Sequence, residues 1–181
     1  PFDNVPFDNV LREGDLGQVL ATVNDPHERA VLLTLALQGW RVSELCKMTW
    51  KQIRAGAQEG SWVAEWKAKR DKLRVQGIQA AVMEAVLGLK GKRGAAEPFL
   101  PHPDGGHWTR YQVHGLVTWV SAAFGRRVTP HGLRATYISS VISRKGIEAA
   151  RQLAGHKSIT TTQRYSRWQI ESDDPLTVED L

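Results

Sequence analysis

The sequence predicts a mostly helical α+β domain with a small antiparallel β-sheet. Apolar residues recur every three or four positions over most of the 181-residue chain, which is the spacing of amphipathic helices. Strict alternation replaces this spacing only in residues 62–76, which indicates a pair of strands. This length suits one domain, or two small ones, and allows a substantial buried core; no clear internal boundary interrupts the pattern.

The N-terminal part predicts a short linker followed by two helices. The chain opens on a tandem copy of Pro-Phe-Asp-Asn-Val, which is too short for a repeat architecture and is interpreted as a linker. A first helix is predicted from four apolar residues on one face, Leu16, Val19, Leu20 and Val23. A second is predicted over about 26–38, ended by Gly39, with four buried side chains, Val31, Leu32, Leu35 and Ala36.

The middle of the chain predicts a short helix and then a hairpin. The short helix begins near Val42 and includes Glu44. The first strand is predicted from the alternation of Trp62, Ala64 and Trp66 with their neighbours. The second follows from Leu73 and Val75 alternating with Arg74 and Gln76, and the turn between the strands is expected at Arg70-Asp71.

Helical spacing returns after the hairpin. Pro and Gly in residues 98–106 indicate a loop within this part. One predicted helix has a clear apolar stripe, formed by Val113, Leu116, Val117, Val120 and Phe124. The predicted helices cover about 79–89, 108–124, 132–143, 147–154 and 158–167.

Composition excludes several classes of protein. Apolar residues make up 41% and charged residues 24% of the chain, which is ordinary for a globular domain. No apolar run approaches the roughly 18 residues of a membrane span, and no segment has the order of a secretory signal. The single cysteine, Cys46, offers neither an internal disulfide nor a cysteine metal cage. We therefore expect no membrane partner and a cytoplasmic setting.

Charge is distributed unevenly and favours a polyanionic partner. The net charge is +5, but residues 41–93 carry twelve basic and five acidic side chains, a net of +7. Residues 126–167 carry nine basic side chains and one acidic side chain, whereas residues 171–180 hold five acidic ones and no basic one. Two basic blocks in a mixed chain indicate a nucleic-acid-binding face.

Three segments contain the candidate chemistry. Residues 39–45 read Gly-Trp-Arg-Val-Ser-Glu-Leu, and residues 129–134 read Thr-Pro-His-Gly-Leu-Arg. The third begins Leu-Ala-Gly-His at 153–156 and ends at Tyr165, nine residues after His156. Each is common alone, but their order and spacing resemble the catalytic boxes of the tyrosine recombinases, the family of phage integrases and Xer-type resolvases. The resemblance covers about residues 15–168.

The resemblance implies both a fold and a function. The fold is that of a tyrosine recombinase catalytic domain. The function is that of a site-specific DNA recombinase or integrase, which cleaves and rejoins double-stranded DNA without a metal or cofactor through a 3′-phosphotyrosine intermediate. Self-assembly into a tetramer on a DNA synapse is expected.

Residue types in the motifs suit phosphoryl transfer. A phosphodiester in transition carries excess negative charge on its non-bridging oxygens, and fixed cationic donors stabilise that charge. Arg41 and Arg134 suit this role because a guanidinium stays charged and binds two oxygens in a planar fork. His156 is expected to be a third donor, and Glu44 to orient Arg41.

The remaining catalytic roles follow from the resemblance. Tyr165 is the expected nucleophile, and a base must take its proton because a free phenol has a pKa near 10. The resemblance assigns that base to His131. It assigns the general acid for the 5′ leaving oxygen to a hairpin lysine, for which Lys69 is the best match, with Lys67 and Lys72 as alternatives.

Further basic residues beside these motifs are expected to contact DNA. They are Lys67, Arg70, Lys72, Arg74, Lys157 and Arg164.

The predicted organisation has three parts. A linker at 1–13 precedes a catalytic domain at 14–168, and a tail follows at 169–181; the N-terminal core-binding domain of the family is expected to be absent. The sequence also departs from the common family pattern. Lys51-Gln52 lies where an acidic residue is frequent, Ala135 where a histidine is frequent, and Trp40 where a small aliphatic residue is usual.

Two alternative functions remain open at this stage. One is a DNA-binding module that kept the fold but lost turnover, and the other is a type IB topoisomerase-like enzyme that relaxes DNA as a monomer. Individually, the motif residues also have structural interpretations. Arg41 could merely pair with Glu44, His131 could cap a helix, and Tyr165 could pack in the core.

Overall fold

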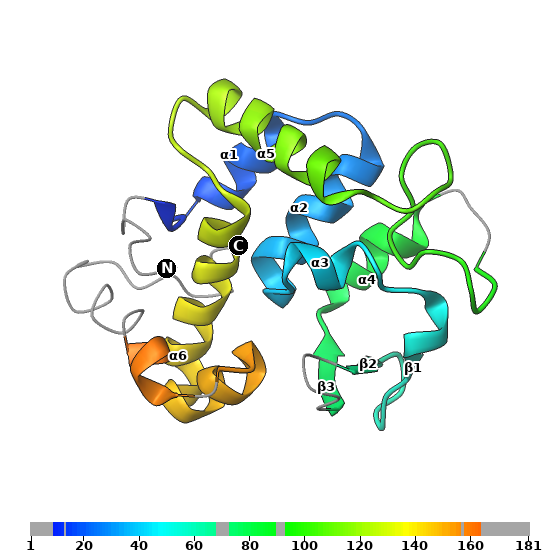
Figure 1. Ribbon diagram of the computed structural model, residues 1–181, viewed down its shortest axis with the longest axis vertical. Helices are drawn as coiled ribbons and strands as arrows, with labels where there is room; N and C mark the ends of the chain where they lie inside the picture. Colours follow the sequence, from blue (N-terminus) through cyan, green and yellow to red (C-terminus); the bar gives the residue numbers. More distant parts are fainter. Residues whose placement is uncertain (1–8, 13, 68–72, 90–92, 157, 164–181) are drawn as a thin grey trace.

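The computed structural model describes residues 9–12, 14–67, 73–89, 93–156 and 158–163 (Figure 1). The predicted turn at Arg70-Asp71 and the predicted helix beyond residue 163 lie outside this part. A 3₁₀ turn, η2 (Trp50–Gln52), precedes the sheet of β1 (Ile53–Ala55), β2 (Trp62–Lys67) and β3 (Leu73–Ile78). The helices are α1 (Asp15–Ala21), α2 (Pro26–Gln38), α3 (Val42–Leu45), α4 (Ala80–Leu87), α5 (Arg110–Phe124) and α6 (Pro130–Ala154).

The central helix α2 has clear start and stop signals. Its N-cap Asp25 accepts hydrogen bonds from the backbone of His27 at 2.8 Å and of Glu28 at 3.1 Å, and Pro26 occupies the first helical position. Gly39 ends it in the left-handed region at φ 59°. The four predicted core residues, Val31, Leu32, Leu35 and Ala36, are all 0% exposed.

One main core lies between the helices and the sheet. In this core, the predicted apolar faces of α1 and α5 pack together with α2, α4 and Trp66 of β2. A second, smaller cluster forms inside α6 from Tyr137, Ile138, Val141, Ala150 and Ala154. Among the described residues, no helix is both long and apolar enough to cross a membrane.

Residues 9–12, which precede α1, pack on α6. Leu11 is 1% exposed, and its backbone N–H donates to Oγ1 of Thr136 at 3.0 Å. A Cβ added at Gly132 would lie 2.1 Å from the carbonyl oxygen of Asn9, so the chain crosses the first turn of α6 at a position that only glycine allows. The predicted linker therefore includes residues that contact the domain, and its boundary at residue 13 stays a prediction.

The sheet is antiparallel, with the order β1–β2–β3. The two predicted strands are confirmed, and β2 buries Ala64 and Trp66 as the alternation indicates. The third strand, β1, was not predicted because three residues are too few for a recognisable alternation. It pairs Ile53 with Ala64 at the edge of the sheet.

Strand β3 turns its polar side chains inward. Leu73 and Val75 are 57% and 51% exposed, whereas Gln76 is buried and Arg74 is partly buried. The register places Arg74 opposite Trp66 on the inner face. This reverses the usual relation between polarity and burial, and it is possible because the inward polar groups have hydrogen-bond and ion-pair partners, such as Trp40 for Gln76 and Glu44 for Arg74.

Helix α6 contains a sharp break. The two helices predicted at 132–143 and 147–154 are confirmed, and they meet at Gly146, whose φ of 81° and ψ of 168° are not helical. Only glycine adopts this conformation without substantial strain. The break lets the end of α6 return towards its beginning, as the yellow and orange part of the chain shows (Figure 1).

Candidate active site

Arg41 and Glu44 form the first half of the site at the start of α3. Arg41 is the N-cap of this helix, and its backbone N–H donates to Oε2 of Glu44 at 2.8 Å. Its Nη1 atom pairs with Oε1 of the same carboxylate at 3.1 Å. The Arg41 side chain remains 43% exposed, so Glu44 orients a guanidinium that solvent and a ligand can reach.

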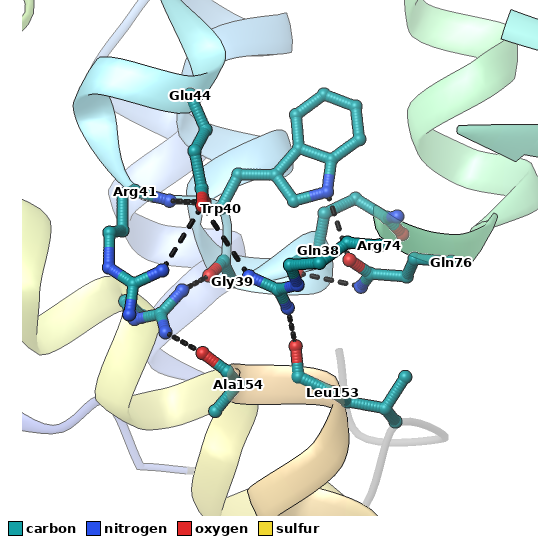
Figure 2. Close-up of polar contacts among 10 residues, drawn as sticks. Gln38, Gly39, Trp40, Arg41, Glu44, Arg74, Gln76, Leu153 and Ala154 are labelled. Atoms are coloured by element: carbon teal, nitrogen blue, oxygen red, sulfur yellow. Dashed lines mark hydrogen bonds and ion pairs between the residues drawn. The ribbon is translucent and has the colours of Figure 1, made fainter. Parts of the chain in front are cut away.

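Glu44 is a shared anchor for cations. Its Oε1 atom also lies 3.4 Å from Nη1 of Arg74, which reaches it from β3 (Figure 2). Burial alone would raise the pKa of Glu44. The backbone hydrogen bond from Arg41 and the charges of Arg41, Arg74 and Arg134 outweigh burial and hold the pKa below its usual value. The carboxylate is therefore ionised at neutral pH and anchors the arginines.

Arg134 forms the second half of the site within α6. It is 5% exposed, its Nη1 donates to the carbonyl oxygen of Gly39, and its Nη2 donates to that of Ala154 at 2.6 Å. These carbonyls lie at the C-terminal ends of α2 and α6, where backbone oxygens lack helical partners and favour cations. Arg134 thus joins three segments that are distant in the sequence.

His131 lies three positions before Arg134, in the first turn of α6. Thr129 caps this helix by accepting from the backbone of Gly132 at 2.9 Å, so a side-chain cap by His131 is not required. Burial lowers the pKa of His131, and the charges of Arg134 and Arg41 lower it further. A neutral imidazole can accept a proton, as a general base must.

His156 follows the C-cap of α6, Gly155. Its backbone N–H donates to the carbonyl oxygen of Arg151 at 3.0 Å, and its Nδ1 lies 3.0 Å from Oγ1 of Thr162. Burial and the charges of Arg134, Arg41 and Arg74, together with His131, lower its pKa to about 4. A neutral imidazole carries one N–H, so His156 can still donate a hydrogen bond to an anion.

Hydrogen bonds from Arg134 bring the predicted groups towards one another, because they reach the carbonyls of Gly39 and Ala154, two positions before Arg41 and His156. Arg41 and Arg134 both lower the pKa of His131 and of His156. These charges act on the two histidines although the residues come from α3, α6 and the turn after α6. The site thus concentrates positive charge that an anion would relieve. A phosphate diester suits such a surface, because its non-bridging oxygens accept hydrogen bonds from guanidinium and imidazole groups.

A buried polar network beneath the site was not anticipated from the sequence. Gln76 accepts from Nε1 of Trp40 at 3.0 Å and donates to the carbonyl oxygen of Gln38 at 2.9 Å and to the hydroxyl of Tyr137 at 3.0 Å. The Tyr137 ring lies against Gly39, where an added Cβ would approach it to 2.2 Å. The network holds Gln38 and Trp40, the residues on either side of Gly39, whose carbonyl binds Arg134, and it explains Trp40 as a hydrogen-bonded core residue.

Several predicted residues lie outside the described part of the chain. They are Lys69, Arg70, Lys72, Lys157, Arg164 and Tyr165. Lys67 is described, and it lies exposed at the end of β2 opposite Leu73. Arg74 is partly buried, with its guanidinium on Glu44 and on the carbonyl oxygen of Leu153. Within the described ranges, no cluster of three or more His, Cys, Asp or Glu side chains is arranged to hold a metal ion.

Sequence comparison identifies related proteins over most of the chain. The sequence profile of the phage integrase family matches residues 9–171. The tyrosine recombinase XerC of Myxococcus xanthus is 28% identical over 176 residues, which cover 90% of this chain and 57% of that protein. The chain therefore spans about half the length of the curated relatives it matches.

Structural comparison agrees with the sequence matches. The XerH site-specific recombinase, in a post-cleavage complex with a palindromic difH substrate, aligns with a TM-score of 0.73 and 17% identity. That alignment covers 92% of this chain and 51% of XerH. The XerA recombinase aligns with a TM-score of 0.70 and 22% identity, over 90% of this chain and 61% of XerA. These likenesses confirm the predicted fold.

Proposed function

The chain belongs to the phage integrase family, and from this premise we propose that it is the catalytic domain of a site-specific tyrosine recombinase. The observation that carries the proposal is that Arg134, three positions after His131, bonds the carbonyls of Gly39 and Ala154, which brings the segments of Arg41 and His156 to the same site. Sequence order alone does not require these residues to meet. Phosphoryl transfer requires such a group of donors.

The two arginines would stabilise the transition state. Arg41 is oriented by Glu44, and Arg134 is held by the carbonyl oxygens of Gly39 and Ala154. Because both are fixed before a substrate binds, little reorganisation is needed when charge develops on the phosphate. Removing one such donor typically costs about 10²–10³ in rate.

The proposed cleavage step moves one proton at each end of the reacting phosphate. The phenol oxygen of Tyr165 attacks phosphorus while its proton passes to neutral His131. The bond from phosphorus to the 5′ oxygen breaks, and that oxygen takes a proton from Lys69. The products are a 3′-phosphotyrosine and a free 5′ hydroxyl. Since one phosphodiester replaces another, the reverse attack by a 5′ hydroxyl rejoins DNA without an external energy source.

Double-stranded DNA is the proposed substrate, and self-assembly is proposed for the exchange of strands. Support comes from the basic blocks of the sequence and from the family, whose solved members include XerH with difH DNA and a lambda integrase dimer bound to a COC′ core site. The basic residues of the hairpin and of the segment after α6 are proposed to contact the phosphate backbone. A tetramer would supply the four cleavages of a complete exchange.

A covalent-adduct assay tests the proposal. The Tyr165→Phe protein is first used to recover its bound sequence from cellular DNA. A nicked duplex of that sequence then lets the cleaved end diffuse away, so that the wild-type protein accumulates a protein–DNA adduct that survives denaturation. The Tyr165→Phe protein should bind the same duplex without forming the adduct. Binding by both proteins with no adduct from either would instead indicate a DNA-binding module.

Supercoiled plasmid separates the second alternative. A type IB topoisomerase-like enzyme relaxes plasmid that lacks any recognised site, and it does so as a monomer. The proposed recombinase should relax such plasmid slowly or not at all, and should exchange strands only between two recognised sites.

A further inference from the structure

Arg74 has contacts that its charge alone does not explain. Its Nη1 lies 3.4 Å from Oε1 of Glu44, and its Nη2 donates to the carbonyl oxygen of Leu153. Its guanidinium carbon lies 4.9 Å from the centre of the Trp66 ring, and the side chain is only 9% exposed. A surface residue that binds DNA phosphates would be expected to point into solvent. Arg74 instead runs between α3 and the end of α6 (Figure 2).

Both partners of Arg74 lead directly to predicted catalytic groups. Glu44 holds Arg41 through the same oxygen that Arg74 contacts, at 3.1 Å. Leu153 lies three positions before His156, at the end of α6. The neighbouring carbonyl, that of Ala154, is bound by Arg134. Two consecutive carbonyls at this helix end are therefore held by two arginines, and both bonds support the turn that presents His156.

Arg74 also belongs to the hairpin. It is the second residue of β3, immediately after the segment that contains Lys69. The register fixes it opposite Trp66 of β2, and the stacking on that ring adds a contact within the hairpin. One side chain therefore connects the strand beside Lys69 to the anchor of Arg41 and to the turn of His156.

We infer that Arg74 is a positioning residue that couples the hairpin to Arg41 through Glu44 and to His156 through the Leu153 carbonyl. This inference rests on the proposed function for its kinetic consequence, but the coupling itself is a property of the protein without DNA. The alternative role, expected from the sequence, is a phosphate contact. The two roles differ in what a lysine at this position would preserve.

Lysine keeps the charge but not the geometry. A guanidinium can bind two partners in different directions, whereas an ammonium is a compact point charge at the end of a shorter side chain. Arg74→Lys should therefore retain attraction to phosphate but lose the simultaneous contacts with Glu44 and Leu153. A misplacement of about 1 Å at a catalytic group can cost on the order of 100-fold in rate.

The test compares Arg74→Lys with Arg54→Lys. Arg54 is a matched control because it lies on β1, pairs with Glu65 at 3.4 Å and has a side chain that is 56% exposed. In hydrogen exchange on DNA-free protein, the amides of Gly155 and His156 should exchange at least about tenfold faster in Arg74→Lys and normally in Arg54→Lys. The amides of α2 should be unchanged in both, as a reference for global stability.

Kinetics provide the second measurement. At saturating DNA, the rate of adduct formation should fall about 100-fold in Arg74→Lys, with DNA affinity and its salt dependence near those of the wild type. Unchanged exchange at Gly155 and His156 overturns the inference whatever the rate does, and so does an equal rise in α2, which would mean general destabilisation. Failure of the wild-type protein to form any adduct would overturn the proposed function, while the exchange result would still decide the inference.

Discussion

The Nη2 atom of Arg134 donates to the carbonyl oxygen of Ala154 at 2.6 Å, although both residues belong to α6 and are twenty positions apart. In a straight helix this separation would be about 30 Å, at 1.5 Å per residue. An arginine side chain cannot span that length. The contact exists because the helix reverses at Gly146, which has φ 81°. The turn that presents His156 is thus brought back to the arginine by a single backbone break.

Gly146→Ala should weaken both the fold and the site. An added Cβ would meet no atom within 4 Å, so the cost comes from the backbone conformation and not from crowding. We expect a loss of about 1–3 kcal/mol in the free energy of unfolding, measured by urea denaturation, together with slower adduct formation. The control is Gly115→Ala in the middle of α5, where an added Cβ also meets nothing. It should raise stability by about 0.5–1 kcal/mol. Equal effects of the two substitutions would contradict this account.

The stability of the protein should depend on pH through His156. Its pKa is about 4 in the folded protein and about 6.5 when unfolded, so between these values the unfolded state binds more protons. The stability from neutral His156 is therefore present above about pH 6.5 and is lost as pH falls towards 4. Denaturation of the wild type and of His156→Gln across this range should show a smaller pH dependence in the variant. Parallel curves would show that His156 titrates normally.

The pH dependence of cleavage should reflect His131. The base must be neutral, and burial with the charges of Arg134 and Arg41 lowers its pKa. With limiting DNA, the rate should rise with pH through a midpoint below the ordinary histidine value of about 6.5 and then level off. This rise of the rate with pH should disappear in His131→Gln, and the rate at high pH should be lower than in the wild type. If the rate of the variant rises with pH as in the wild type, the general base is another residue.

Lys69→Ala should be rescued by a better leaving group. Protonation of the 5′ oxygen should contribute about 10²–10⁴ in rate, because an alkoxide leaves poorly. A substrate with sulfur in the bridging 5′ position needs no such proton. Lys69→Ala should therefore cleave ordinary DNA slowly and the sulfur substrate at most of the wild-type rate. Arg41→Ala should stay slow on both, since its role is charge stabilisation. Equal impairment of Lys69→Ala on both substrates would direct attention to Lys67 or Lys72.

Deletion of residues 171–181 should affect assembly and not chemistry. This segment carries the five acidic residues of the tail, which DNA would repel, and apolar residues that can anchor on protein, including Leu176, Val178 and Leu181. By its likeness to family tails, we expect it to dock on a neighbouring subunit. Adduct formation on single sites should be retained, and cooperative binding to two-site DNA should be lost. Unchanged cooperativity would mean that the tail is only a frayed terminus.

Sequence periodicity was sufficient for most of the fold. Within the described ranges, the main helices, the two hairpin strands and the interruption between residues 143 and 147 agree with the predicted spacing. Strand β1 could not be found because three residues do not establish a period. The reversed face of β3 was also beyond periodicity, since Gln76 is buried for its bonds to Trp40, Gln38 and Tyr137, which are 36 to 61 positions away.

The candidate site was predicted in part. Motif order predicted Arg41, His131, Arg134 and His156, whose catalytic roles stay a prediction; Arg134 bonds the carbonyls of Gly39 and Ala154, which lie two positions before Arg41 and His156. The sequence could not predict the groups that hold the arginines in place. These are the backbone carbonyls of Gly39, Leu153 and Ala154, and a backbone carbonyl has no signature in residue type. Arg74 illustrates the same limit. A count of charges cannot distinguish an arginine that contacts phosphate from one that braces other residues.

The bond between Leu11 and Thr136 has a consequence for synthesis on the ribosome. The two residues are 125 positions apart, so Leu11 emerges long before its partner exists. At about 5–20 residues per second, the delay is roughly 6–25 s. During that time residues 9–12 lack the α6 residues on which they pack in the folded protein. Because Arg41 is likewise made long before Arg134, a nascent chain carries only half of the donor set until Arg134 and His156 have been made.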